Sequence, residues 1–140
     1  MTPKRIHLAG YGRIEEGTAR NDIMPGHLVA LHSSGQIGLH TTAGGQAERA
    51  FAVEDALQGK GIEDQYSMGS RITYVLAAPG DVVYAFLAPG QNASIGSFLA
   101  AGGSGNLRVA SGTDVRLAVA LEALDLTSSG SPGRIRVRVL

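Results

Sequence analysis

Single glycines recur at short intervals along this chain, and they constrain its fold more than any other feature. Twenty of the 140 residues are glycine, about twice the average usage, and no segment concentrates them as a linker would. Glycine adopts a positive φ without a Cβ clash, which tight turns between strands often require. Two Ala-Pro-Gly turns, Ala78–Gly80 and Ala88–Gly90, are typical of type II turns, in which proline presets the first φ. The pattern predicts many short strands.

The segments between the turns have the residues and the period of β-strands. Apolar runs of strand length are separated by turn signals every ~8–12 residues, a spacing typical of a sandwich or a small barrel. We expect a helical turn or a loop at 54–61. Strands are expected at 27–32, 36–40, 47–53, 71–77, 82–87, 93–101, 107–110 and 134–140. The expected fold class is all-β: a single small β-barrel or sandwich domain of short antiparallel strands.

The segment Val115–Leu124 is ambiguous between strand and helix. Alternation at Val115, Leu117, Val119 and Leu121 fits a strand, whereas Leu117, Leu121 and Leu124 fit a helical stripe. The strand interpretation is favoured because the flanking segments are β throughout.

The clearest strand in the sequence is its last segment. Ile135, Val137 and Val139 are expected to point inward, and Arg134, Arg136 and Arg138 outward. Three like charges on one face repel one another unless negative groups lie opposite. These arginines therefore pair with acids of a neighbouring element, meet an acidic partner surface, or protect a solvated edge strand.

Residues 1–22 are expected to form an extended N-terminal arm, and residues 23–140 the barrel-like domain. The first segment carries charges and glycines but too few apolar residues for a core face. It is either a frayed terminus or a segment that becomes ordered on a partner.

The composition argues against several function classes. Twelve basic and twelve acidic residues give a formal net charge of zero, whereas nucleic-acid binders usually carry a basic excess. Without cysteine, disulfides and thiolate metal sites are impossible. The apolar runs are far shorter than the ~20 residues that span a bilayer, and residues 1–10 lack the apolar region of a signal peptide. Neither nucleic acid nor membrane is expected as a partner.

No group of residues predicts catalysis, so we expect neither an enzyme nor a cofactor. The run Gly102–Gly105 has a serine among glycines, but it lacks the spacing of a nucleophile elbow or a phosphate loop. His27, His32 and His40 are the candidate metal ligands, but the first two lie five apart and face opposite sides of a regular strand. A cupin-like or other small-barrel enzyme or ligand-binding module remains the alternative class.

Several segments follow one another in an informative order. They are Pro25-Gly-His-Leu-Val29, Gly35–Gly38, Ala50-Phe-Ala-Val-Glu-Asp55, Gly59–Tyr66, Gly69–Tyr84, Ile95-Gly-Ser-Phe-Leu99, Gly103–Leu107 and the closing Arg-Ile-Arg-Val-Arg-Val. Over residues 23–140 this order resembles the small capsid decoration proteins of tailed phages, also called cement or head-stabilising proteins.

The resemblance implies a β-barrel or β-tulip-like module that sits as a homotrimer on the outer surface of an expanded phage head. It implies a virion protein, assembled in the host cytoplasm, that stabilises the capsid by bridging major capsid subunits. It also implies an arm that adds a strand to the shell, with capsid-binding residues Lys4, Arg5, Ile6, Leu8, Tyr11 and Arg13.

The segment Val82–Leu87, or alternatively the segment Val115–Leu121, is expected to lie near the contacts between subunits. The former is apolar on both faces, which is more than one side of a half-exposed strand needs. The residues predicted to contact a second subunit are Val82, Tyr84 and Phe86.

Overall fold

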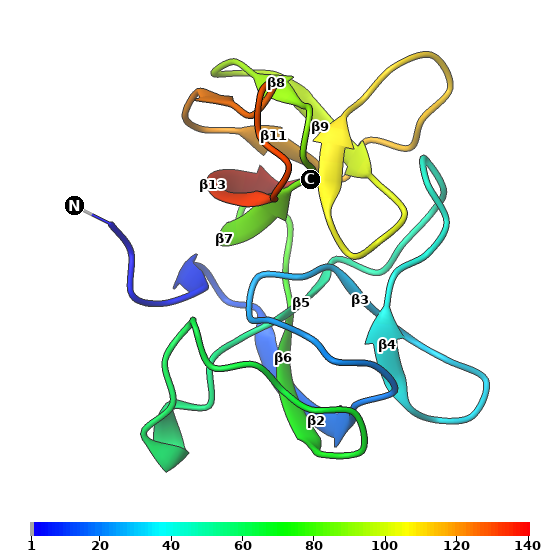
Figure 1. Cartoon of the computed structure of the whole chain (residues 1–140), viewed down its shortest axis with the longest axis vertical. Coiled ribbons are helices and arrows are strands. Elements are labelled where there is room, and N and C mark those ends of the chain that lie inside the picture. Colours follow the sequence, from blue (N-terminus) through cyan, green and yellow to red (C-terminus); the bar gives the residue numbers. More distant parts are fainter. Residues whose placement is uncertain (1) are drawn as a thin grey trace.

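A closed five-stranded β-barrel forms the upper half of this computed structural model, which describes residues 2–140 (Figure 1). Its strands, in order around the barrel, are β7 (Val82–Leu87), β10 (Leu107–Val109), β9 (Phe98–Ala101), β11 (Ala118–Ala120) and β13 (Gly133–Val139), which pairs back to β7. All neighbours are antiparallel except β10 and β7. Strand β1 (His7–Ala9) pairs with β7, and β8 (Asn92–Ala93) pairs with β12 (Leu124–Asp125). The all-β prediction is confirmed.

A second group of strands forms the lower half of the molecule (Figure 1). A three-stranded antiparallel sheet has the order β2 (Arg13–Thr18), β6 (Arg71–Leu76), β5 (Ala50–Ala52). A hairpin of β3 (Val29–Leu31) and β4 (Ile37–Leu39) lies beside it. The loop that connects β5 to β6 contains a single turn of 3₁₀ helix, η1 (Ala56–Gln58).

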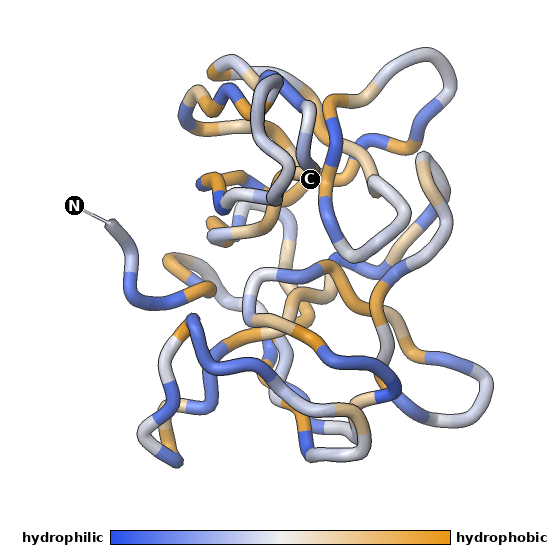
Figure 2. Tube along the Cα trace, viewed as in Figure 1, coloured by the Kyte–Doolittle hydropathy of each residue, from blue (hydrophilic) through white to orange (hydrophobic). Residues whose placement is uncertain are grey.

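Strands β5 and β6 of this sheet lie between two hydrophobic cores, whereas the edge strand β2 is largely exposed. Phe51 and Val75 face the barrel core, whereas Ala50, Ala52 and Ile72 face the second core. This alternation fits the period of two along a strand. Figure 2 shows the hydrophobic stretches running through the interior of both halves. The two halves therefore form one continuous packing unit.

Several local expectations are confirmed. Gly80 and Gly90 have positive φ values of 93° and 82°, as the second position of a type II turn requires. The segment Val115–Leu124 contains no helix; its strand residues are β11 at 118–120 and the first residue of β12, with the rest in loops. One expected strand, at 93–101, is divided by a turn at Gly96, where φ is 88°.

The last strand is paired with a neighbour on each side of the closed barrel. The interpretation of its arginines as protection of a solvated edge strand is therefore wrong. β13 pairs with both β7 and β11, and Ile135, Val137 and Val139 are buried as expected. Outside the barrel, Arg134 pairs with Glu63 and Arg136 with Glu122. The like charges are therefore offset mainly by acids of the same chain.

The segment 1–22 also differs from the expected arm, because its described residues are part of the fold. β1 pairs with β7, β2 pairs with β6, and Ile6 and Ala19 are fully buried. Few apolar residues suffice here because the two strands obtain their hydrogen bonds from strands of both halves. Met1 lies outside the described residues.

Candidate functional site

The N-terminal segment is held to the barrel by one buried carboxylate. Asp81, only 2% exposed, accepts hydrogen bonds from the backbone N–H groups of Tyr11 (3.0 Å), Gly12 (2.8 Å) and Ala78 (3.1 Å) and pairs with His7 Nε2 at 3.0 Å. Burial alone would raise the pKa of Asp81. These hydrogen bonds outweigh that effect and lower the pKa below its usual value.

Glycine at position 10 is what allows this close approach. Its φ is +117°, and a Cβ placed there would lie 1.9 Å from Oδ1 of Asp81. Only glycine fits a backbone that is both in this conformation and this close to a side chain. The glycines of the N-terminal segment therefore serve its docking.

The predicted capsid-binding residues separate into exposed and buried groups. Lys4, Arg5, Tyr11 and Arg13 are exposed, and the Tyr11 side chain is 98% accessible. Leu8 is partly buried. Ile6 is fully buried in the barrel core, so its side chain is not available to a partner.

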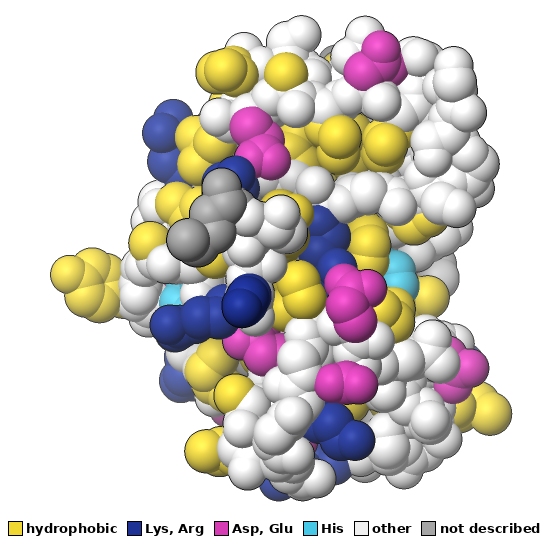
Figure 3. All heavy atoms as spheres, turned by 60° about the vertical axis from the view of Figure 1, so that its left-hand side comes forward, with side chains coloured by type: hydrophobic (Ala, Val, Ile, Leu, Met, Phe, Trp, Pro, Cys, Tyr) yellow, Lys and Arg dark blue, Asp and Glu magenta, His cyan; other side chains and the backbone are white. Residues whose placement is uncertain are grey.

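A groove runs between the N-terminal segment, the edge strand β2 and η1. It encloses about 340 Å³ and is lined mainly by Arg5, His7, Ile14, Glu16 and Leu57. Ile14 is half exposed, and Leu57 is 97% exposed. Figure 3 shows this side of the molecule, where basic, acidic and hydrophobic side chains are interleaved.

The outer face of β7 is largely covered by the chain itself. Phe86 is 9% exposed and lies between the ring of His27, with centroids 4.8 Å apart, and the guanidinium of Arg134, 4.5 Å from its centroid. Val82 and Tyr84 are partly buried. The second apolar face of this strand is thus used within the subunit, and Phe86 is not accessible as a contact residue.

Arg134 connects the barrel to two loops of the lower half. Its guanidinium donates to the carbonyl oxygen of Pro25 at 3.1 and 3.2 Å and to that of Ile62 at 2.6 Å, and it pairs with Glu63. Burial, and then the charge of Arg134, lower the pKa of His27 to about 4. The alternation of the last strand indicated that Arg134 points outward, but it contained no signal for these contacts with the two loops.

The three candidate histidines are not brought together. His32 and His40 lie at opposite ends of the β3–β4 hairpin, because His32 N–H bonds to Gln36 and His40 N–H to Leu28. Nε2 of His40 lies 3.1 Å from the carbonyl oxygen of Gln46. Among residues 2–140, no group of three His, Asp or Glu side chains is placed to hold a metal ion.

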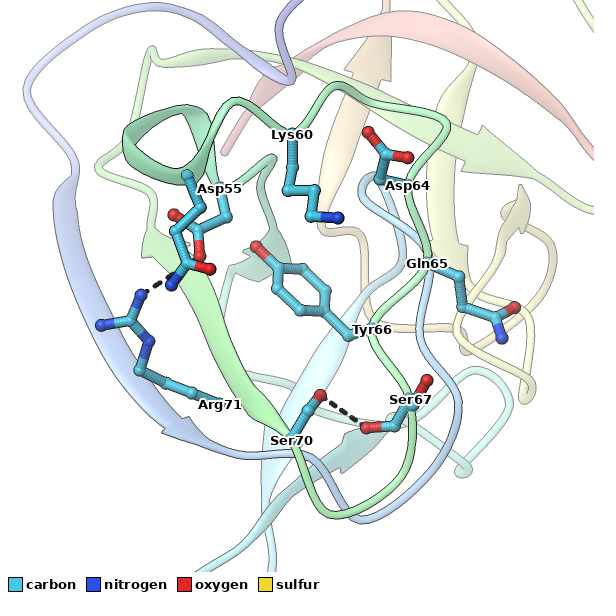
Figure 4. A pocket seen from close by; sticks show the side chains of 9 residues that line it. Asp55, Lys60, Asp64, Gln65, Tyr66, Ser67, Ser70 and Arg71 are labelled. Carbon is cyan, nitrogen blue, oxygen red and sulfur yellow. Dashed lines mark hydrogen bonds and ion pairs between the residues drawn. The ribbon is translucent and has the colours of Figure 1, made fainter.

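A polar hollow of about 260 Å³ lies between the β5–β6 loop and the start of β6 (Figure 4). Tyr66 forms its base and donates its hydroxyl to the carbonyl oxygen of Val53 at 2.6 Å. Asp55 pairs with Arg71 at 3.1 Å at one side, and Lys60 extends over the hollow. Burial is the main reason that the pKa of Tyr66 is raised above its usual value. The hollow offers hydrogen-bonding groups of both charges.

No helix in the part of the chain that the structure describes is long and apolar enough to cross a membrane.

The architecture defines a class: a closed five-stranded barrel joined to a second, smaller set of strands that contributes side chains to the barrel core and has a core of its own. No family model matches the chain, and no curated protein matches it. Among solved structures, the fold is similar to the head fiber gp8.5 N base in bacteriophage phi29. The TM-score is 0.61 at 11% sequence identity, over 93% of this chain and 95% of that one. This likeness shows a shared fold.

Proposed function

We propose that this protein is a structural protein of a phage head. It binds the outer surface of the expanded capsid and stabilises it by bridging neighbouring major capsid subunits. The observation that supports this role best is the fold similarity to a phage head fibre base, which extends over nearly the full length of both chains. The proposed mode of action is binding alone, without catalysis or a cofactor, and the proposed location is the virion.

The exposed N-terminal face is the proposed capsid-binding surface. Lys4 and Arg5 supply positive charge, Arg13 pairs with Glu15 at 2.9 Å, and Tyr11 supplies an exposed aromatic ring. Arginine and aromatic residues are enriched at protein interfaces and among the residues that dominate binding energy. Asp81 holds the N-terminal segment on the barrel, so this segment is ordered before it binds the capsid. It therefore loses less conformational entropy on binding than a free arm would.

The proposed assembly on the head is a homotrimer. Three linked copies of one binding face act at high effective concentration once the first is engaged. Weak contacts by a single N-terminal face would then suffice for stable decoration.

Binding to heads tests this proposal directly. Expanded heads lacking the protein, prepared from a deletion strain of the virus that encodes it, are mixed with purified protein and sedimented. We expect co-sedimentation that decreases with salt and is weakened in the double variant Arg5→Glu, Tyr11→Ala. The Tyr11 substitution keeps the backbone N–H that bonds to Asp81, and Lys60→Glu, at an exposed residue outside the N-terminal segment, serves as the charge-matched control. Failure of the wild-type protein to bind heads would overturn the proposed function.

A further inference from the structure

One outer face of the barrel carries an exposed aromatic residue beside two arginines. Phe98 of β9 lies opposite Val119 of β11, which in turn lies opposite Arg138 of β13. Phe98 is 42% exposed, and the guanidinium of Arg116 lies 4.6 Å from its ring centroid. These four residues, Phe98, Arg116, Val119 and Arg138, are called the arginine–aromatic patch.

The patch carries positive charge that the chain does not offset locally. The other barrel arginines, Arg108, Arg134 and Arg136, each form an ion pair with a carboxylate. Neither Arg116 nor Arg138 has a carboxylate of residues 2–140 within ion-pair distance, and both are exposed. An acidic surface is the complement that this patch lacks.

The lower half contains a groove of the complementary kind, here called the acidic groove. It encloses about 170 Å³ between the β3–β4 hairpin and the β2–β6–β5 sheet, and its walls are mostly apolar. Glu48 and Glu15 lie at it, the latter also paired with Arg13 at 2.9 Å, and Leu31, 62% exposed, stands at its rim. Burial, followed by the charges of these two carboxylates, raises the pKa of Tyr74, which also lines the groove.

The patch and the groove lie near each other on the molecular surface. The guanidinium of Arg49 donates to the carbonyl oxygen of Arg116 at 3.5 Å, and Arg49 directly follows Glu48 of the groove. Each copy of the chain therefore presents the arginine–aromatic patch and the acidic groove side by side.

We propose that the protein self-associates by seating the arginine–aromatic patch of one copy in the acidic groove of a second copy. Phe98 enters the apolar space, and Arg116 and Arg138 meet Glu48 and Glu15. Each copy carries both surfaces, so the contact repeats from copy to copy, and we propose that its rotation closes into a ring, as in the homotrimer proposed above. This inference goes beyond the proposed capsid role and stands without it, because the arginine–aromatic patch and Glu48 lie outside the N-terminal segment, and only Glu15, through its ion pair with Arg13, adjoins it.

A charge swap tests the contact. Arg116→Glu and Glu48→Arg each place like charges across the proposed contact, which weakens self-association by roughly tenfold to a hundredfold in sedimentation equilibrium. When the two variants are mixed, the carboxylate introduced in the first meets the guanidinium introduced in the second. Where the patch of the second variant meets the groove of the first, the contact keeps native Arg116 and Glu48. The equimolar mixture should therefore associate more strongly than either variant alone.

Several results would overturn the proposal. They are a monomeric wild-type protein at high micromolar concentration, unchanged association of the single variants, or a mixture that does not recover. Lys60→Glu is the matched control, because it makes the same change of charge at an exposed residue outside both surfaces and should leave the oligomer intact. Circular dichroism of each variant separates loss of contact from loss of fold. If the wild-type protein associates only after heads are added, its oligomer forms through the capsid and not through this contact.

Discussion

Replacing Asp81 by alanine should destabilise the protein more than almost any other single substitution of a polar residue. Its carboxylate accepts three backbone N–H groups and pairs with His7, and it is 2% exposed. Each buried donor that loses its acceptor costs about 1–3 kcal/mol, less where water can reach it. Because the Tyr11 side of the site is open to solvent, we expect a total loss of about 3–5 kcal/mol.

The loss should be measured as the free energy of unfolding in urea at neutral pH. Asp81→Asn is the informative companion: it keeps one carbonyl oxygen but turns the other acceptor into a donor, so it should cost about 1–3 kcal/mol. Hydrogen exchange provides a local readout, since the amides of Tyr11 and Gly12 should lose protection before the barrel does. A loss below about 1 kcal/mol for the alanine variant would refute the assigned role of this carboxylate.

The same site predicts a dependence on acid. The pKa of Asp81 is lower in the folded protein than its ordinary value of 3.8. Its contribution to stability is therefore present above that value and is lost as the pH falls through the folded pKa. The wild-type protein should lose more stability than Asp81→Asn does in this acidic range.

Three further predictions concern Gly10, Phe86 and His27. Gly10→Ala should cost more than about 2 kcal/mol in urea unfolding, because its Cβ clashes and its φ is strained, whereas Gly90→Ala, strained but in open space, should cost about 1 kcal/mol. Phe86→Ala should cost about 3–5 kcal/mol and the half-exposed Phe98→Ala clearly less; equal losses would contradict the burial of the former. His27 should titrate near pH 4 by NMR, and an unperturbed titration would contradict this. Because its pKa in the unfolded chain is 6.5, the free energy of unfolding should fall by about 3 kcal/mol as the pH drops from 6.5 to 4.

Local features were predictable because they depend on neighbouring residues alone. Alternation placed Ile135, Val137 and Val139 inside, and Pro-Gly pairs placed the turns at Gly80 and Gly90. A period of two and a positive φ are properties of the backbone over a few residues. The sequence therefore determined the all-β class, most strands, and the faces of the strongest ones.

The pairing of distant segments was decided only by the tertiary structure. The barrel closes through β13 on β7 and through a parallel contact between β10 and β7, and neither pairing has a local signature. The N-terminal residues look too polar for a core, yet Ile6 is buried because strands far along the chain provide its surroundings. Nor did any motif mark Asp81, whose partners in the N-terminal segment lie about seventy residues away in sequence.

The candidate surfaces follow the same division. Charge and apolarity at Lys4, Arg5, Tyr11 and Arg13 were visible in the sequence, but their rigid placement depends on a buried carboxylate elsewhere. The sequence also showed a strand with two apolar faces, and only packing decided that Phe86 is covered by the chain itself. Composition determines which side chains can form contacts, whereas long-range packing determines which of them remain exposed to a partner.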